Sequence, residues 1–353
     1  MAQVALVVGI TGVTGTPLAE QLLRRPGWTV YGVSRRRPEL AQDVPLERLH
    51  HIAADLQDAQ ATLAALRSCS DATHIFHCAN DGDSATRTRM LANLLDAAEQ
   101  TMPRFANINL LQGTKYYGCH LGPFKTPAKE TDPRVPGADF YYSEEDLVRA
   151  RQKDGNWTWT AVRPHSVCGY AAGNPMNLAV VLAIYGAMLK ELGRPFGFPG
   201  NEACFGALFQ VIDAELLARS AIWVSTHDSC ANNAFNTGNG DWFRWRHLWP
   251  RLAEWFGLEP AGPQRYSLAD FLADHRALWI EMVKRHGLRP FPYERAPRWA
   301  QGDYRAPSSR MSCEYDVLSD TLKLRQHGFA EVQESGDMFL RLFERCRRER
   351  VIP

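Results

Sequence analysis

A glycine-rich stretch near the start of the chain, residues 4–15 with the sequence VALVVGITGVTG, constrains the fold more than any other feature. A valine-rich apolar run ends at Gly9, and further glycines follow at Gly12 and Gly15. A helical pattern over residues 17–25 comes next. Strand, glycine turn and helix in this order direct backbone N–H groups and the positive end of the helix dipole toward a phosphate. Glycine also lets a pyrophosphate approach the backbone closely. We therefore expect a dinucleotide to be bound by Gly9, Thr11, Gly12, Val13, Thr14 and Gly15. A βα turn without a ligand is the alternative.

Strand-like and helical patterns alternate regularly through the first half of the chain. Strands are expected over residues 28–34, 50–54, 73–78, 105–111 and 157–164, and helices over 58–68, 84–101 and 139–153. This alternation predicts an α/β fold with a doubly wound, parallel Rossmann sheet. The second half is expected to be mostly helical, with short strands over 208–211 and 234–237 and helices over 177–192, 213–224, 241–256, 268–286, 312–325 and 336–348. We expect a dinucleotide-binding domain of residues 1–172 and 208–240 and a smaller substrate-binding domain of residues 173–207 and 241–353.

The end of the second expected strand indicates which dinucleotide is bound. The glycine spacing, G-x-x-G-x-x-G, resembles that of the short-chain dehydrogenase superfamily. An acid about 20 residues beyond the glycines would bind the ribose 2′-hydroxyl of NAD, but Ser34 is followed here by Arg35 and Arg36. Guanidinium groups pair well with phosphate, so we expect NADPH with its 2′-phosphate on these arginines; a solvated turn is the alternative. Further cofactor contacts are expected from Asp55, Leu56, Pro164 and Val167.

Composition excludes several classes of function. The chain has 353 residues and a net charge of +1, which argues against binding to nucleic acid or to an anionic membrane. The longest apolar run, residues 178–189, is too short to span a bilayer. No signal peptide is visible, and the eight cysteines form no C-x-x-C pair. We expect reduced thiols, no metal site and a cytoplasmic location.

Candidate catalytic residues follow the fifth expected strand and open the next helix. Short-chain dehydrogenases have Tyr-x-x-x-Lys at the start of this helix, where one turn places both side chains on one face. Tyr142 occupies the tyrosine position, but Asp146 stands four residues later. A carboxylate cannot replace the lysine, since its charge would raise the pKa of a nearby phenol. Lys115, at the end of the neighbouring strand, is the candidate for the missing cation. Tyr142 as an ordinary aromatic at a helix start, with the adjacent Tyr141 easily confused with it, is the alternative.

Several motifs together resemble one family. They are GITGVTG, SRRR, QGTKYYG, GPF, FYYSEED, VRPHSVCGY, FPGN and NNAFNTGNGDWFRWRHLW. The set is similar to the progesterone 5β-reductase/iridoid synthase-like (PRISE) family of atypical extended short-chain dehydrogenases, and it covers nearly the whole chain. The resemblance implies NADPH-dependent reduction of the C=C bond of a small enone or enal, with Tyr142 and Lys115 as catalytic residues. A homodimer is expected only from the habit of the superfamily.

The chain departs from plant members of that family on the substrate side. The loop over residues 79–84 is shorter, residues 118–120 are extra, and His165 stands where asparagine is usual. This pattern looks more like a bacterial branch and leaves the natural substrate open. The substrate pocket is expected to include Asn80, Phe124, His165, Met176 and Phe205. Two other functions stay open: a carbonyl reductase or epimerase, and a non-catalytic NADPH-binding regulator.

Overall fold

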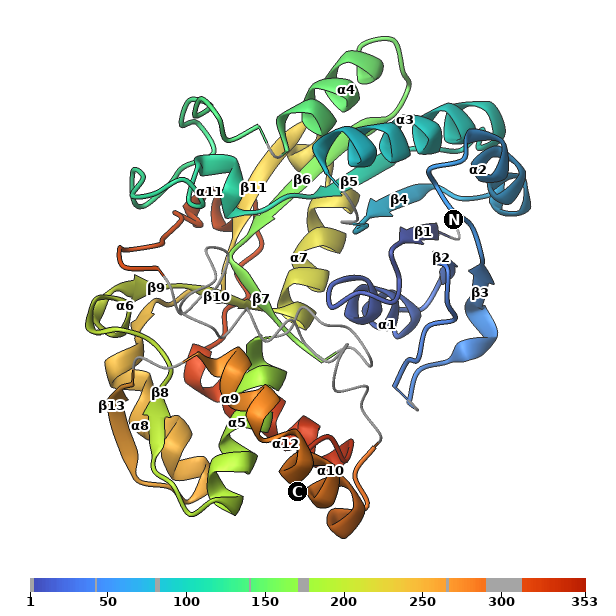
Figure 1. The fold of residues 1–353 in the computed structure, drawn as a ribbon. Helices are drawn as coiled ribbons and strands as arrows, with labels where there is room; N and C mark the ends of the chain where they lie inside the picture. Colours follow the sequence, from blue (N-terminus) through green and yellow to red (C-terminus); the bar gives the residue numbers. More distant parts are fainter. Residues whose placement is uncertain are drawn as a thin grey trace.

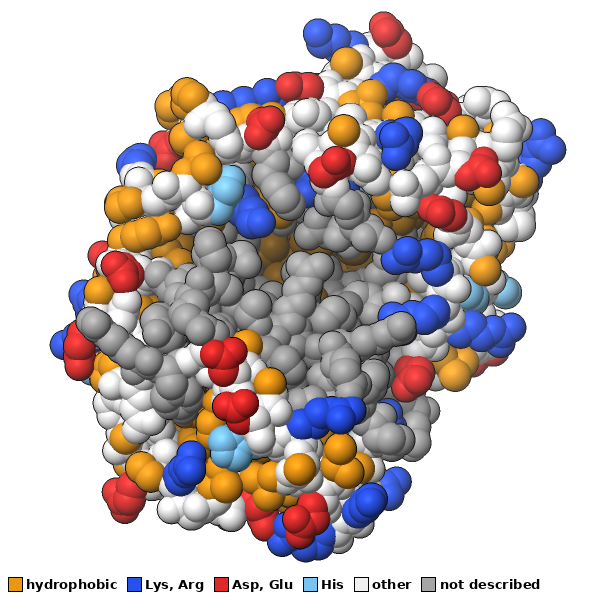
Figure 2. Space-filling model, in the orientation of Figure 1, with side chains coloured by type: hydrophobic (Ala, Val, Ile, Leu, Met, Phe, Trp, Pro, Cys, Tyr) orange, Lys and Arg blue, Asp and Glu red, His pale blue; other side chains and the backbone are white. Residues whose placement is uncertain are grey.

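A computed structural model describes most of the chain. The described residues are 3–41, 43–79, 83–139, 141–170, 178–264, 267–289 and 313–353. Figure 1 shows a twisted sheet with helices on both faces, and a mostly helical region below the strand ends. Outside the grey atoms, the face seen in Figure 2 mixes acidic and basic side chains over its surface. Among the described helices, none combines the length and the apolar character that crossing a bilayer requires.

The central sheet has seven parallel strands in the order β11-β6-β5-β4-β1-β2-β3. The bounds are β1 (Gln3–Val8), β2 (Trp28–Val33), β3 (Leu49–Ile52), β4 (His74–His77), β5 (Asn107–Leu111), β6 (Thr158–Pro164) and β11 (Asn233–Thr237). Side chains of a strand alternate between the two faces of its sheet. In β1, Val4, Leu6 and Val8 enter one hydrophobic cluster, whereas Ala5 and Val7 enter another. The predicted doubly wound parallel sheet is therefore confirmed.

Helices cover both faces of the sheet. One cluster packs beneath α2 (Ala59–Leu66), α3 (Ser84–Thr101) and α4 (Tyr142–Gln152). The opposite cluster packs beneath α1 (Gly15–Leu23) and α7 (Ala214–Thr226). Short 3-10 helices lie at η1 (Leu46–Arg48), η2 (Arg67–Cys69), η3 (Thr114–Tyr117) and η4 (Asp228–Cys230).

The second half of the chain builds its own aromatic core. Its helices are α5 (Leu178–Glu191), α6 (Glu202–Gly206), α8 (Trp245–Phe256), α9 (Leu268–Asp274), α10 (Arg276–His286), α11 (Leu322–Gln326) and α12 (Ser335–Arg348). The short strands outside the central sheet are β7 (Ser166–Cys168), β8 (Phe196–Phe198), β9 (Leu208–Phe209), β10 (Val211–Asp213), β12 (Phe243–Arg244) and β13 (Pro260–Pro263). Phe196 stacks on Trp249 with ring centroids 4.4 Å apart, and Trp245 is fully buried. The rings of Phe196, Trp245 and Trp249 therefore fill this core.

Two helix predictions were wrong. The helix expected over 268–286 is two helices that meet at His275, whose Nδ1 lies 2.7 Å from the carbonyl oxygen of Phe271. The helix expected over 312–325 is reduced to α11 among the described residues. The residues before α11 are extended because their backbone pairs elsewhere: Val317 N–H donates to the carbonyl of Leu208 at 2.9 Å. Tertiary pairing here overrides the local pattern.

Candidate functional site

The glycine turn after β1 has the geometry of a phosphate cradle. Gly9 has φ +80, and a Cβ added there would lie 2.9 Å from the backbone nitrogen of Ala79. A Cβ on Gly15 would lie 2.2 Å from the carbonyl oxygen of Gly9. No described side chain caps the N terminus of α1, and its first turn carries no acid. The turn therefore fits the pyrophosphate of a dinucleotide, with backbone N–H groups and the helix dipole directed at the anion.

The residues expected to contact the rest of the dinucleotide follow strands on the same edge of the sheet. Because β1, β2 and β3 are parallel neighbours, their carboxyl ends lie together. Arg35 and Arg36 are exposed after β2. The Ser34 hydroxyl donates to the Arg36 carbonyl at 2.5 Å and lies 3.1 Å from Nε2 of His51, which the sequence did not single out. The end of β6 and the following β7, with Pro164 and Val167, pair with β11 and β10. Beyond β3, Asp55 Oδ1 accepts from the N–H of Gln57 at 3.1 Å, and Leu56 is buried.

The two adjacent tyrosines at the start of α4 have different surroundings. The Tyr142 hydroxyl accepts a hydrogen bond from the N–H of Val135 at 2.9 Å and donates to the carbonyl of Tyr116 at 2.7 Å. Burial is the main reason that the pKa of Tyr142 is raised. Both partners of this phenol are backbone groups of the loop after β5. The Tyr142 hydroxyl therefore links two parts of this loop.

The Tyr141 hydroxyl, by contrast, lies where β5 and β6 end. A Cβ added to Gly113 would lie 3.2 Å from this hydroxyl and 3.5 Å from the carbonyl oxygen of Pro164. Because Gly113 has no side chain, the Tyr141 hydroxyl can lie close to its backbone. Ligands of open α/β sheets bind outside these carboxyl ends. Successive residues of a helix point about 100° apart, so only one of the two tyrosines can reach this position.

If Tyr141 is taken as the tyrosine of the Tyr-x-x-x-Lys motif, a different residue stands at the lysine position. Four residues on stands Glu145, which is 1% exposed. Its Oε2 accepts from Arg163 Nη2 and Gln112 Nε2, both at 2.9 Å, and its Oε1 accepts from Arg149 Nε at 2.9 Å. Burial opposes ionisation, but Arg163 and the other donors outweigh it and lower the pKa of Glu145. This ionised carboxylate ties α4 to the ends of β5 and β6.

Asp146, expected at the lysine position, faces solvent instead. Its side chain is 58% exposed and accepts from both terminal nitrogens of Arg134, at 2.6 and 2.8 Å. The same guanidinium lies 4.6 Å from the ring centroid of Tyr142. The exposed ion pair of Arg134 and Asp146 therefore lies next to Tyr142. Asp146 does not take the position next to Tyr141 that the motif lysine would have.

Lys115 lies in η3, two residues beyond Gly113, and is half-buried. Its charge is felt by the exposed His120 in the loop that follows. Burial first, and then the charge of Lys115, lower the pKa of His120, while Asp139 opposes them. The structure thus places the Lys115 ammonium group beyond the end of β5. It lies on the same loop as Gly113, the residue next to the Tyr141 hydroxyl.

The expected pocket residues have mixed surroundings. His165 is buried, with Nε2 2.8 Å from the Ser319 hydroxyl. Phe124 packs against the tyrosine cluster after β5 and also against the aromatic core of the second half. Phe205 packs on Phe198 with ring centroids 4.8 Å apart. Asn80 and Met176 lie outside the described residues.

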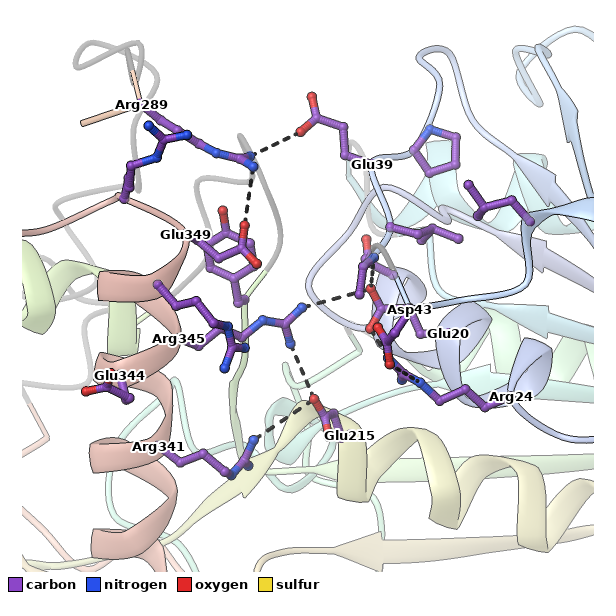
Figure 3. Close-up of a pocket in the computed structure, with 18 residues that line it drawn as sticks. Glu20, Arg24, Glu39, Asp43, Glu215, Arg289, Arg341, Glu344, Arg345 and Glu349 are labelled. Atoms are coloured by element: carbon purple, nitrogen blue, oxygen red, sulfur yellow. Dashed lines mark hydrogen bonds and ion pairs between the residues drawn. The ribbon is translucent and has the colours of Figure 1, made fainter. Parts of the chain in front are cut away.

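A cavity of about 1070 Å³ lies elsewhere, between α1, the residues 38–41 and 43–46, and α12 (Figure 3). Several of its charges form ion pairs across it: Arg345 lies 3.3 Å from Glu215 and 3.9 Å from Glu20. Burial is the main reason that the pKa of Glu20 is raised. An ion pair of Arg345 joins α12 to α1 across this cavity, and its lining residues do not include Tyr141 or Lys115.

Comparison with known proteins identifies the family of the chain and several of its relatives. Residues 50–353 match the family described as PRISE-like Rossmann-fold domain. The chain is 32% identical over 374 residues to the (S)-8-oxocitronellyl enol synthase ISY2 of Nepeta cataria, an alignment that covers 99% of this chain and 92% of that protein. It is 31% identical over 373 residues to a 3-oxo-Delta(4,5)-steroid 5-beta-reductase of Arabidopsis thaliana, covering 99% and 93%.

Solved structures of low sequence identity share the fold. The UDP-glucose 4-epimerase of Thermus thermophilus, in complex with NAD, superposes with a TM-score of 0.68 at 19% identity and covers 98% of this chain and 99% of that one. WbmG of Bordetella bronchiseptica, also with NAD, gives 0.67 at 16% identity and covers 100% and 96%. These likenesses confirm the expected extended Rossmann fold. The relatives that are named as enzymes, one of them a reductase, confirm the expectation of an oxidoreductase.

Proposed function

Since the chain belongs to the PRISE-like Rossmann-fold family, we propose that it reduces the C=C bond of an α,β-unsaturated ketone or aldehyde with NADPH. The observation that carries this proposal is the Tyr141 hydroxyl at the ends of β5 and β6, on the same sheet edge as the glycine turn. One relative is named for a 3-oxo-Delta(4,5)-steroid, a compound in which a carbonyl is conjugated with a C=C bond.

The cofactor is assigned to the edge formed by the glycine turn and the ends of β2 and β3. The turn at Gly9 and Gly15 would hold the pyrophosphate, and Arg35 and Arg36 would bind the 2′-phosphate. When bound, NADPH supplies the hydride that is added to the β-carbon of the enone. The preference for NADPH over NADH rests on the two exposed guanidinium groups and on the absence of an acid next to them in the sequence.

The protein's own contribution is electrostatic. Tyr141 would donate a hydrogen bond to the carbonyl oxygen of the substrate, where negative charge develops as the hydride adds to the β-carbon. Lys115 would add positive charge on the same loop. The α-carbon takes its proton from water, so the phenol is not required to lose its own. This explains why an ionised Glu145 is tolerated where a typical short-chain dehydrogenase keeps lysine.

A carbonyl reductase or an epimerase fits this site less well. A phenol that must exchange its proton directly with substrate is served by a lysine one helical turn away, and Glu145 stands there. A regulator that binds NADPH without turnover would need neither Tyr141 at the strand ends nor the space at Gly113. The cytoplasmic location, the homodimer and the bacterial branch remain predictions.

The test is NADPH oxidation, followed by its near-ultraviolet absorbance, with small enones and enals such as 2-cyclohexen-1-one and with NADH in parallel. We expect turnover with NADPH, formation of the saturated ketone and much weaker activity with NADH. Formation of the allylic alcohol would identify a carbonyl reductase instead. Tight NADPH binding without turnover on any member of the panel would favour the regulator.

A further inference from the structure

A buried charge cluster lies behind Tyr141, on the side of α3. Arg87 of α3 donates through Nη2 to Oε2 of Glu144 in α4, and the two side chains are only 2% and 8% exposed. His77, the last residue of β4, places its Nε2 3.8 Å from Oε1 of the same carboxylate. These three residues, which we call the Arg87 cluster, come from three different elements, β4, α3 and α4.

The Arg87 cluster touches the candidate catalytic residue directly. The Arg87 guanidinium carbon lies 5.0 Å from the centroid of the Tyr141 ring, within the range of an attractive contact between a cation and an aromatic face. The hydroxyl end of the same side chain lies beside Gly113. We propose that Arg87, clamped by Glu144, is a positioning residue that holds the Tyr141 phenol at the ends of β5 and β6. This inference rests on the proposed role of Tyr141.

The burial of the pair supports a positioning role over a stabilising one. Taking two charges out of water is expensive, and a buried ion pair often stabilises a fold no better than apolar residues of the same volume. Burial, followed by the charge of Arg87, lowers the pKa of His77 to about 4, so His77 is neutral near neutral pH. Within the described part of the chain, neither ring nitrogen of His77 has a hydrogen-bond partner. The buried ion pair and the unpaired imidazole are therefore weak contributors to folding stability, whereas the arrangement fixes a guanidinium against the Tyr141 ring.

The neighbouring tyrosine provides a matched control. Arg134 lies 4.6 Å from the centroid of the Tyr142 ring and pairs with Asp146, so an arginine again lies against a tyrosine ring and pairs with a carboxylate. Its Nη2 also lies 3.8 Å from Oε1 of Glu145. Here, however, the pair is at the surface, with 37% and 58% exposure, and the phenol it supports bonds to backbone groups of a loop. Removal of Arg134 therefore tests whether loss of any arginine from a tyrosine ring of α4 affects the reaction.

The principal variant is the double substitution Arg87→Met/Glu144→Gln, which removes both charges and leaves no buried ion unpaired. We expect kcat with NADPH and 2-cyclohexen-1-one to fall about 10- to 100-fold, because small displacements of a catalytic group are costly. The KM for NADPH should stay within about threefold, since the cluster lies outside the cofactor cradle. Arg87→Lys, which keeps a cation beneath the ring, should recover most of the loss, and Arg134→Met should leave kcat within about twofold.

Two results would overturn the inference. If the double substitution lowers kcat by the same factor in a Tyr141→Phe background as in the wild-type protein, the cluster does not act through the Tyr141 hydroxyl. If kcat is unchanged, the cluster does not position the phenol at all.

A readout that needs no turnover separates this inference from the proposed function. In protein labelled with 3-fluorotyrosine, the ¹⁹F resonance of Tyr141 can be assigned by its loss in Tyr141→Phe. We expect the double substitution to shift this resonance and leave that of Tyr142 in place. An unmoved Tyr141 resonance would overturn the positioning role even if the wild-type protein reduces no enone, whereas a shift without any enone turnover would refute only the proposed reaction.

Discussion

Replacement of Tyr142 by phenylalanine should reduce stability and leave the chemistry intact. The hydroxyl links two backbone groups, accepting from the N–H of Val135 at 2.9 Å and donating to the carbonyl of Tyr116 at 2.7 Å. A typical hydrogen bond contributes about 1 kcal/mol net, and a buried group left unpaired costs somewhat more. We therefore expect the free energy of unfolding to fall by about 1–3 kcal/mol.

The assay for Tyr142→Phe combines two measurements on one preparation. Urea denaturation followed by tryptophan fluorescence reports the loss of stability, and NADPH oxidation with 2-cyclohexen-1-one reports kcat, which should stay within about threefold of wild type. The opposite pattern would refute the reasoning: unchanged stability with a fall in kcat of about 100-fold or more would place this hydroxyl at the reacting atoms. Tyr142 would then be the catalytic tyrosine that the sequence motif suggested.

Three further predictions concern the close approach at the strand ends, the cofactor and the pH dependence of stability. Gly113→Ala places a Cβ 3.2 Å from the Tyr141 hydroxyl, which must move by a few tenths of an ångström, so kcat should fall about 10-fold at an unchanged KM for NADPH. Substitution of both Arg35 and Arg36 by serine should raise the KM for NADPH about 10- to 100-fold and leave that for NADH unchanged, as steady-state kinetics with the two cofactors will show. Because burial lowers the pKa of His77 from 6.5 to about 4 in the folded protein, the unfolded chain binds the proton first, and the free energy of unfolding should fall as the pH drops from 6.5 to 4, by at most about 1.4 kcal/mol per pH unit. His77→Phe should flatten this part of a urea-denaturation pH series, and a slope equal to that of wild type would contradict the assignment.

The framework of the site was accessible from sequence because it depends on local patterns. The alternating valines of β1, the abrupt stop at Gly9 and the helical pattern after Gly15 define a βα unit without any knowledge of tertiary contacts. Parallel strands bring their carboxyl ends to one edge, so the sequence predicts that Ser34 and Asp55 lie on the same edge as the glycine turn.

The choice between Tyr141 and Tyr142 could not be made from local sequence. Two adjacent aromatic residues at a helix start have equivalent patterns, and their directions depend on which side of α4 is buried. Our assignment of Tyr141 depends on the ion pair of Glu145 with Arg163, two residues that are 18 positions apart and meet only in the folded chain. Glu145 and Asp146, one helical turn later, differ in burial in the folded protein. Their residue types alone do not predict which of the two carboxylates is buried.

Long-range pairing also hid the Arg87 cluster and the extended segment before α11. Arg87 and Glu144 are 57 residues apart, and each alone looks like a solvated helix residue. Val317 was expected in a helix, but its N–H donates to the carbonyl of Leu208, more than 100 residues earlier in the chain. In both cases the conformation or burial of a residue is set by a partner far away in the sequence. Local sequence patterns therefore could not predict it.

The most direct test of the central claim compares Tyr141→Phe with the wild-type protein in NADPH oxidation with 2-cyclohexen-1-one. Removal of one hydrogen-bond donor to a developing oxyanion typically costs about 100- to 1000-fold in kcat, and we expect a loss of that size with unchanged NADPH binding. A Tyr141→Phe protein that keeps full activity would contradict the assignment of the reacting site to the ends of β5 and β6.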